Sequence, residues 1–114
     1  MTKTLRALKI DAVNHTITEY AYTGLASMQE AVGGYITTAH RLPNGDEIFV
    51  NDEGIYESPY YWFTVKSAHQ PFAGNGIIVG NADENGDTTA AKSTIAELIN
   101  NIRFVVRIPA LKQA

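Results

Sequence analysis

The chain of 114 residues is close to the usual size of one domain, and we expect residues 1–114 to fold as a single unit. Hydrophobic residues make up 45% and charged residues 18% of the chain, which argues against an intrinsically disordered protein. The absence of cysteine excludes disulfides and thiolate metal sites, and a formal net charge of -3 argues against a protein that binds nucleic-acid phosphates.

The first part of the chain predicts a hairpin followed by a helix. Periodicity leaves residues 5–10 ambiguous, but the turn-forming residues 11–15 that follow favour a strand there. Residues 16–22 are rich in the Thr, Ile and Tyr side chains that favour strands, so they form the second arm of the hairpin. Thr23 is expected to cap a short helix, and Gly33-Gly34 is expected to end it. The apolar positions of this helix are Leu25, Met28 and Val32.

A second hairpin and a central strand are predicted next. Residues 35–40 and 47–51 are rich in strand formers and flank Asn44-Gly45, a pair that tolerates the positive φ of a hairpin turn. Residues 56–63 concentrate five aromatic side chains around Ser58-Pro59, and residues 64–66 are expected to continue as a strand. The apolar run 77–79 is bounded by glycines, which predicts a buried central strand.

The last helix has the clearest pattern in the chain. Residues 87–89 offer possible N-caps, while the capping-box pattern Thr94-x-x-Glu97 indicates a later start. Residues 104–108 form the predicted closing strand, which Pro109 ends. The predicted fold class is therefore α+β, a single mainly antiparallel sheet with two helices in the order β-β-α-β-β-(aromatic segment)-β-α-β. The apolar stripe of the last helix, with helical spacing, is Ile95, Leu98, Ile99 and Ile102.

The aromatic segment is the feature that most suggests a binding site. Clustered Tyr and Trp side chains beside a proline can anchor a protein interface or stack on a planar ligand, since they offer a large area at low entropy cost. The alternative is that half of them face the core. The polar residues that end the second hairpin, just before this segment, complete the candidate set. The candidate binding residues are Tyr56, Tyr60, Tyr61, Trp62, Asn51, Asp52 and Glu53.

Other motifs predict no catalytic, cofactor or metal site. The glycines at 74, 76 and 80 have the wrong spacing for a dinucleotide loop, and the alternating polar residues 83, 85 and 87 lack the glycine and glutamate of a calcium loop. The three histidines lie too far apart in sequence to form a local metal pair. The carboxylates at 46, 47, 52 and 53 lie at hairpin ends, where charged residues are common.

Three blocks of the sequence follow one another along the chain: Leu25-x-x-Met28-Gln29-x-x-Val32-Gly33-Gly34-Tyr35-Ile36, then Val50-Asn51-Asp52-Glu53-Gly54, then Ile78-Val79-Gly80-Asn81-Ala82 with Gly86-Asp87-Thr88-Thr89. They resemble a small domain of unknown function that is common in bacteriophages, plasmids and actinobacteria. Together they cover roughly two thirds of the chain in the order found in that family. The aromatic segment stands where the family usually has a Leu-Pro-x-Asn-like stretch. The resemblance implies an accessory protein of a mobile element in a bacterial cytoplasm, and it implies no activity.

These observations leave three functional hypotheses. The leading one is a non-catalytic binding or accessory protein that acts on a host protein or a small molecule. The second is a small hydrolase-like enzyme that uses carboxylates and a histidine, such as Asp52, Glu53 and His40. The third is a nucleic-acid-binding module, which needs a basic face assembled from Lys3, Arg6, Lys9, Arg41, Lys66, Arg103 and Arg107.

Location and assembly follow from the same patterns. Charged residues interrupt the N-terminal apolar run, and no stretch approaches the ~20 apolar residues of a membrane span. We therefore expect a cytoplasmic protein with no membrane contact and no cofactor. A homo-oligomer is a further possibility, because a small domain with open sheet edges gains stability by pairing them.

Overall fold

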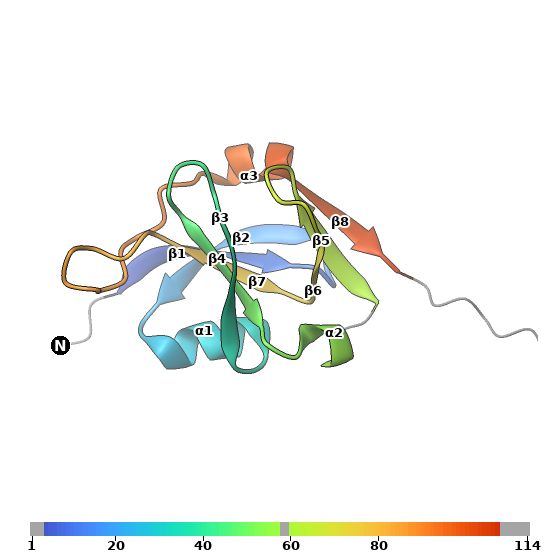
Figure 1. The fold of residues 1–114 in the computed structure, drawn as a ribbon, viewed down its shortest axis with the longest axis horizontal. Helices are drawn as coiled ribbons and strands as arrows, with labels where there is room; N and C mark the ends of the chain where they lie inside the picture. Colours follow the sequence, from blue (N-terminus) through green and yellow to red (C-terminus); the bar gives the residue numbers. More distant parts are fainter. Residues whose placement is uncertain (1–3, 58–59, 108–114) are drawn as a thin grey trace, which may run out of the picture.

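Two antiparallel sheets and three helices form the described part of the chain, residues 4–57 and 60–107, in the computed structural model (Figure 1). The larger sheet has the strand order β2-β1-β7-β4-β3, and the smaller sheet has the order β6-β5-β8. The strands of the larger sheet are β1 (Leu5–Asp11), β2 (Thr16–Tyr22), β3 (Ile36–Arg41), β4 (Glu47–Asn51) and β7 (Gly76–Val79). Those of the smaller sheet are β5 (Tyr61–Val65), β6 (Phe72–Ala73) and β8 (Ile102–Val106).

The short apolar strand β7 lies at the centre of the larger sheet. Its residue Ile78 is paired with Leu8 of β1 on one side and with Ile48 of β4 on the other. All four residues of β7 are buried, because one face of the sheet is covered by a helix and the other by the smaller sheet together with a second helix. The prediction of a buried central strand at residues 77–79 is confirmed.

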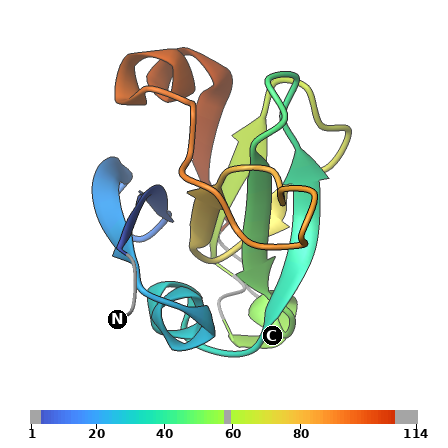
Figure 2. The same cartoon turned by 90° about the vertical axis from the view of Figure 1, so that its left-hand side faces the viewer.

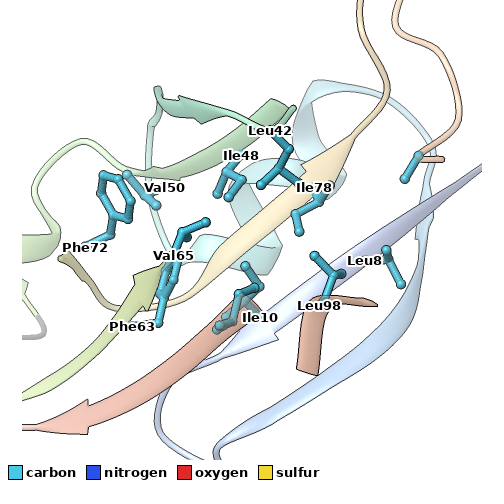
Figure 3. Packing of buried hydrophobic residues seen from close by; sticks show 12 residues of the cluster. Leu8, Ile10, Leu42, Ile48, Val50, Phe63, Val65, Phe72, Ile78 and Leu98 are labelled. Carbon is cyan, nitrogen blue, oxygen red and sulfur yellow. The ribbon is translucent and has the colours of Figure 1, made fainter. Parts of the chain in front are cut away.

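The two faces of the larger sheet bury different side chains, because successive residues of a strand point to opposite faces. One face packs on α1 (Leu25–Val32), which lies below the sheet in Figure 1. The other face packs on the smaller sheet and α3 (Ile95–Asn101), as Figures 2 and 3 show. Ala7, Ile77 and Val79 face α1, whereas Leu8, Ile10, Ile48 and Ile78 face Phe63, Val65, Phe72, Leu98 and Ile102.

The N-cap of α1 lies one residue later than predicted. Gly24, not Thr23, is the N-cap residue. The hydroxyl oxygen of Ser27 accepts a hydrogen bond of 3.0 Å from the N–H of Thr23, which fixes the start of the helix. Leu25 is exposed, so the buried face consists of Met28, Ala31 and Val32 with Ser27. The predicted left-handed C-cap is present at Gly33, where φ is 83°.

The start of α3 is set by a capping box and by a buried carboxylate. Thr94 and Glu97 cap each other's backbone N–H groups, so the helix starts at Ile95 and not near residues 87–89. The segment before it is held by Asp46, a fully buried residue whose carboxylate accepts the N–H groups of Lys92 and Ser93 and the hydroxyl of Ser93. Asp46 is thus a structural residue of the core, not an ordinary charge at a hairpin end.

The predicted α+β class with mainly antiparallel strands is confirmed, and the structure adds three features. The strands divide into two sheets because β5 and β8 each carry one apolar face, which packs on the larger sheet instead of extending it. The two-residue strand β6 and the one-turn helix α2 (Gly54–Glu57) are too short to leave a periodic pattern. The predicted end of the last strand at Pro109 lies outside the described residues.

Within residues 4–57 and 60–107, none of the helices has the length and apolar character needed to cross a membrane.

Candidate functional site

A pocket of about 200 Å³ lies where the end of β4 meets α2 and β6. We call it the α2 pocket. Its wall combines a mainly apolar surface with a few polar side chains, which is the usual character of a binding site. The apolar residues of the wall are Val50, Ile55, Trp62, Pro71, Phe72 and Ala73, and the others are Thr37, Asn51, Asp52, Gly54 and Gln70.

The polar end of the α2 pocket is built by the turn between β4 and α2. Asn51 is buried, and its side-chain oxygen accepts the N–H of Glu53 at 2.8 Å while its amide group donates to the carbonyl of Val32 at 3.4 Å. The N–H of Asp52 donates to the carbonyl of Tyr35 at 2.8 Å. These bonds fix the turn to the end of α1 and leave the side chains of Asp52 and Glu53 exposed.

Gly54 lets this turn approach β6 closely. A Cβ atom at this position would lie 2.7 Å from the carbonyl oxygen of Ala73, a distance that side chains do not adopt. The close approach places α2 directly against β6, so that Ile55 and Phe72 both line the pocket. Close packing against β6 therefore explains why a glycine stands at the end of the second family-like block.

Trp62 forms part of the pocket wall opposite the turn. Its side chain is 9% exposed, and the guanidinium of Arg107 lies 5.4 Å from the centre of one of its rings. Its neighbour Phe63 points the other way and is fully buried in the core between the sheets. Trp62 and Phe63 thus lie on opposite faces of β5, as the alternation along a strand requires, with Phe63 toward the core and Trp62 toward the pocket.

Large apolar side chains are exposed around the pocket. Tyr56 on α2 is 85% exposed, Ile55 is 63% exposed, and Tyr35, whose carbonyl binds Asp52, is 79% exposed. Exposed apolar side chains beside a pocket commonly mark an interaction site. We call Tyr35, Ile55 and Tyr56 the apolar rim of the α2 pocket.

The structure brings three of the seven predicted site residues into the pocket wall, namely Asn51, Asp52 and Trp62. Glu53 and Tyr56 lie beside them on the turn and on α2. Tyr60 is exposed just before β5, and Tyr61 is half-buried opposite Val106 of β8; neither lines the pocket.

The groups of the hydrolase hypothesis do not converge. The β3–β4 ladder pairs Ile36 with Asn51 but His40 with Ile48, so His40 lies at the far end of the hairpin from Asp52. Its ring is instead 2.8 Å from the hydroxyl of Ser67. Within the described residues, no group of three or more histidine or carboxylate side chains is arranged to hold a metal ion.

Two of the basic residues named for the nucleic-acid hypothesis are paired with carboxylates within the protein. Arg6 forms an ion pair of 2.7 Å with Glu19, and Arg41 forms one of 2.9 Å with Glu47. The hydrogen bonds with Glu19 raise the pKa of Arg6, which is thus engaged within the protein. Lys3 lies outside the described residues.

A second hollow, of about 580 Å³, borders the loop that follows β7. Its acidic residues Asp83 and Asp87 belong to the stretch that resembles a calcium loop. The carboxylate of Asp83 accepts the N–H groups of Asn85 and Asp87, so it closes the turn itself. None of the predicted site residues lines this hollow.

Several residues of the α2 pocket escaped the sequence analysis. Thr37, Gln70 and Pro71 come from β3 and from the segment before β6, which are distant in sequence from the aromatic segment. Tyr35 and Ile55 resemble ordinary core residues in a linear sequence. The signal in the sequence that points to this site is the pair of family-like blocks at residues 25–36 and 50–54. These two blocks are joined beside the pocket by the hydrogen bond from the N–H of Asp52 to the carbonyl of Tyr35.

Comparisons with known proteins give one match. The profile of the family DUF3846, described as a domain of unknown function, matches residues 5–103, which include all eight strands and three helices given above except the end of β8. No curated protein and no solved structure matches the chain. The match confirms the resemblance to a small domain of unknown function. The chain belongs to the DUF3846 family.

Proposed function

We propose that this chain is a non-catalytic binding module of a phage or other mobile element, which acts in a bacterial or host-cell cytoplasm. Its partner is a host protein, and the binding surface is the α2 pocket with its apolar rim. The observation that carries the proposal is the exposure of Ile55, which lines the pocket together with the only tryptophan of the chain, and of Tyr56 and Tyr35, which lie on the segments that border it.

The energetics of the apolar rim support an interface. Leaving side chains such as Tyr56 and Ile55 in water forgoes about 1.5–3 kcal/mol each relative to full burial. A partner that covers them recovers this free energy, and aromatic anchors beside a pocket are the usual hot spots of protein interfaces. The exposed carboxylates of Asp52 and Glu53 add a polar, acidic border, as interface rims have.

The size of the α2 pocket favours a protein partner over a free small molecule. Pockets for drug-sized ligands usually enclose about 300–1,000 Å³. The 200 Å³ of the α2 pocket matches one large apolar side chain instead. We therefore propose that a partner inserts a single apolar side chain against Trp62, and that its neighbours cover the apolar rim.

Affinity capture with matched variants tests this proposal. Ile55→Ser and Tyr56→Ser should each reduce capture of the host protein by more than tenfold, whereas Ile99→Ser should not. Ile99 is a matched control because it is also 63% exposed but lies on α3. Equal loss with Ile99→Ser, or full capture by the double variant Ile55→Ser/Tyr56→Ser, would contradict the proposed surface.

A fluorescence measurement distinguishes a protein partner from a small molecule. The fluorescence of Trp62 reports on the pocket, since it is the only tryptophan. If purified protein binds low-molecular-weight extract with a change in Trp62 emission that Ile55→Ser abolishes, the occupant is a small molecule. Self-association of the chain is measured separately by light scattering.

A further inference from the structure

The outer edge of β8 is a second candidate interaction surface. β8 ends the smaller sheet on the side of β5 away from β6, and no strand of residues 4–57 and 60–107 pairs with its outer side (Figure 1). We propose that this edge binds an extended segment of a partner protein in which two acidic residues flank an apolar one, in the pattern acidic-x-apolar-x-acidic.

Two hydrogen bonds establish which backbone groups of β8 are available. The N–H of Arg107 donates to the carbonyl of Tyr60 at 2.6 Å, and the N–H of Lys66 donates to the carbonyl of Asn101 at 2.8 Å. In an antiparallel ladder, bonded pairs alternate with non-bonded pairs. The register therefore turns the backbone groups of Arg103 and Val105 toward β5, and those of Phe104 and Val106 outward. These outward groups can pair with an added strand.

The other sheet edges are less suited to accept a strand. The outer strand β3 is interrupted by a register shift between Thr38 and His40, and such bulges protect edges from pairing. β6 contains only two residues, and β2 is flanked by α1 and α3. The regular ladder of β8 with β5 extends from Ile102 to Val106 without a bulge or a proline.

The side chains of β8 specify the chemistry of the partner. Ile102 is buried in the core, so Arg103, Val105 and Arg107 share the opposite face of the strand, and all three are exposed. None of the twelve Asp and Glu residues of the chain lies in β5, β6 or β8, whereas Lys66 follows β5, Arg103 lies in β8 and Arg107 follows β8. This sheet is thus a basic region of an acidic protein. Cross-strand neighbours of Arg103 and Arg107 would be carboxylates, and the neighbour of Val105 would be apolar.

The same charges disfavour a second copy of the chain as the occupant. Antiparallel pairing of two β8 strands would bring Arg103 and Arg107 of both copies onto one face of a shared sheet. Like charges at neighbouring cross-strand positions are destabilising. An acidic partner strand instead neutralises both arginines.

Nuclear magnetic resonance with a synthetic peptide tests the proposal. The probe is an acetylated, amidated peptide of sequence Thr-Glu-Thr-Val-Thr-Glu-Thr, and the control peptide has Lys in place of both Glu residues. We expect the acidic peptide to slow amide hydrogen exchange at Phe104 and Val106 and to leave exchange at Arg103 and Val105 unchanged. Binding should weaken as salt is added, because exposed charges are screened. No change at Phe104 and Val106 at about 1 mM peptide, the weak end of specific binding, would overturn the proposal.

Three variants test the two parts of the proposal separately. Val106→Pro removes an outward N–H without touching the bonds to β5 and should abolish peptide binding. Arg103→Glu should weaken it by at least about threefold to fivefold, because it removes one exposed ion pair and places a like charge opposite the peptide carboxylate. Lys92→Glu makes the same charge change at an exposed residue before α3 and should have no effect. Equal binding of the lysine peptide, equal loss with Lys92→Glu, or a dimer in light scattering that Val106→Pro dissociates would overturn it.

This proposal and the proposed function can fail independently. The double variant Ile55→Ser/Tyr56→Ser changes only the apolar rim of the α2 pocket, so it should bind the acidic peptide as the wild type does. Val106→Pro should conversely retain capture of a partner that uses the α2 pocket alone.

Discussion

Replacing Asp46 with alanine should cost a large part of the stability of this protein. The carboxylate of Asp46 is fully buried and accepts three hydrogen bonds from the segment before α3, at 2.9 Å from Lys92 N, 2.8 Å from Ser93 N and 2.7 Å from Ser93 Oγ. Arg6 holds the same segment by donating to the carbonyls of Ala91 and Ser93. Asp46→Ala therefore leaves three donors without their acceptor where α3 joins the core.

The expected cost follows from the number and kind of these bonds. Hydrogen bonds to a charged group contribute about 1.5–3 kcal/mol each, but they act here as one network, so their contributions do not add fully. Disruption of a buried charged network usually costs about 3–5 kcal/mol, and we expect this loss in the free energy of unfolding. The midpoint of thermal unfolding should fall by about 10–20 °C.

Urea unfolding followed by circular dichroism measures this loss, and Asp46→Asn is the matched control. Asparagine keeps one oxygen for Ser93 but turns an NH₂ group toward Lys92 N, so it should cost only about 1–2 kcal/mol. If Asp46→Ala unfolds within about 1 kcal/mol of the wild type, the inference that Asp46 holds the start of α3 is wrong.

Four further substitutions test other contacts. Burial would raise the pKa of Asp11, but hydrogen bonds from the backbone and side chain of Asn14, with smaller contributions from Lys9 and Val13, lower it below 3.8. The ionised Asp11 thus stabilises the fold above about pH 3.8. Asp11→Asn should therefore lower the free energy of unfolding in urea at neutral pH, and its difference from the wild type should shrink as the pH falls below 3.8. A difference that stays constant with pH would contradict this. Gly54→Ala should cost about 1–3 kcal/mol, because its Cβ meets the carbonyl of Ala73, and unchanged thermal unfolding would contradict the close approach. Val105→Pro should cost about 3 kcal/mol by breaking the ladder with β5, whereas Val106→Pro should cost under about 1 kcal/mol; the reverse order in denaturant unfolding would refute the assigned hydrogen-bond pattern.

The local parts of this fold could be predicted from the sequence. The hairpin of β1 and β2, the turn at Asn44-Gly45 and the capping box of Thr94 and Glu97 all depend on residues within a few positions of one another. Backbone preferences and capping act over such short distances, so their patterns are visible in a linear sequence.

The long-range parts could not be predicted in this way. β5 pairs with β8 across more than thirty residues, and nothing in either apolar strand identifies its partner. Asp46 follows Asn44-Gly45 as many solvated turn residues do, and only its contact with Ser93 explains its burial. The α2 pocket likewise has Thr37 of the larger sheet and Trp62 of the smaller sheet in one wall, which only the packing of the two sheets explains.

Site-specific photo-crosslinking tests the central claim, that the α2 pocket and its apolar rim bind a partner, most directly. A photoreactive phenylalanine analogue replaces Tyr56 on α2, and in a second sample it replaces Ile99 on α3, which is exposed elsewhere on the surface. After irradiation in host cells, mass spectrometry identifies the crosslinked partner. We expect one partner to be crosslinked from position 56 and not from position 99, and to be lost when Ile55→Ser is added. The same crosslinks from both positions, or none from position 56, would contradict the account.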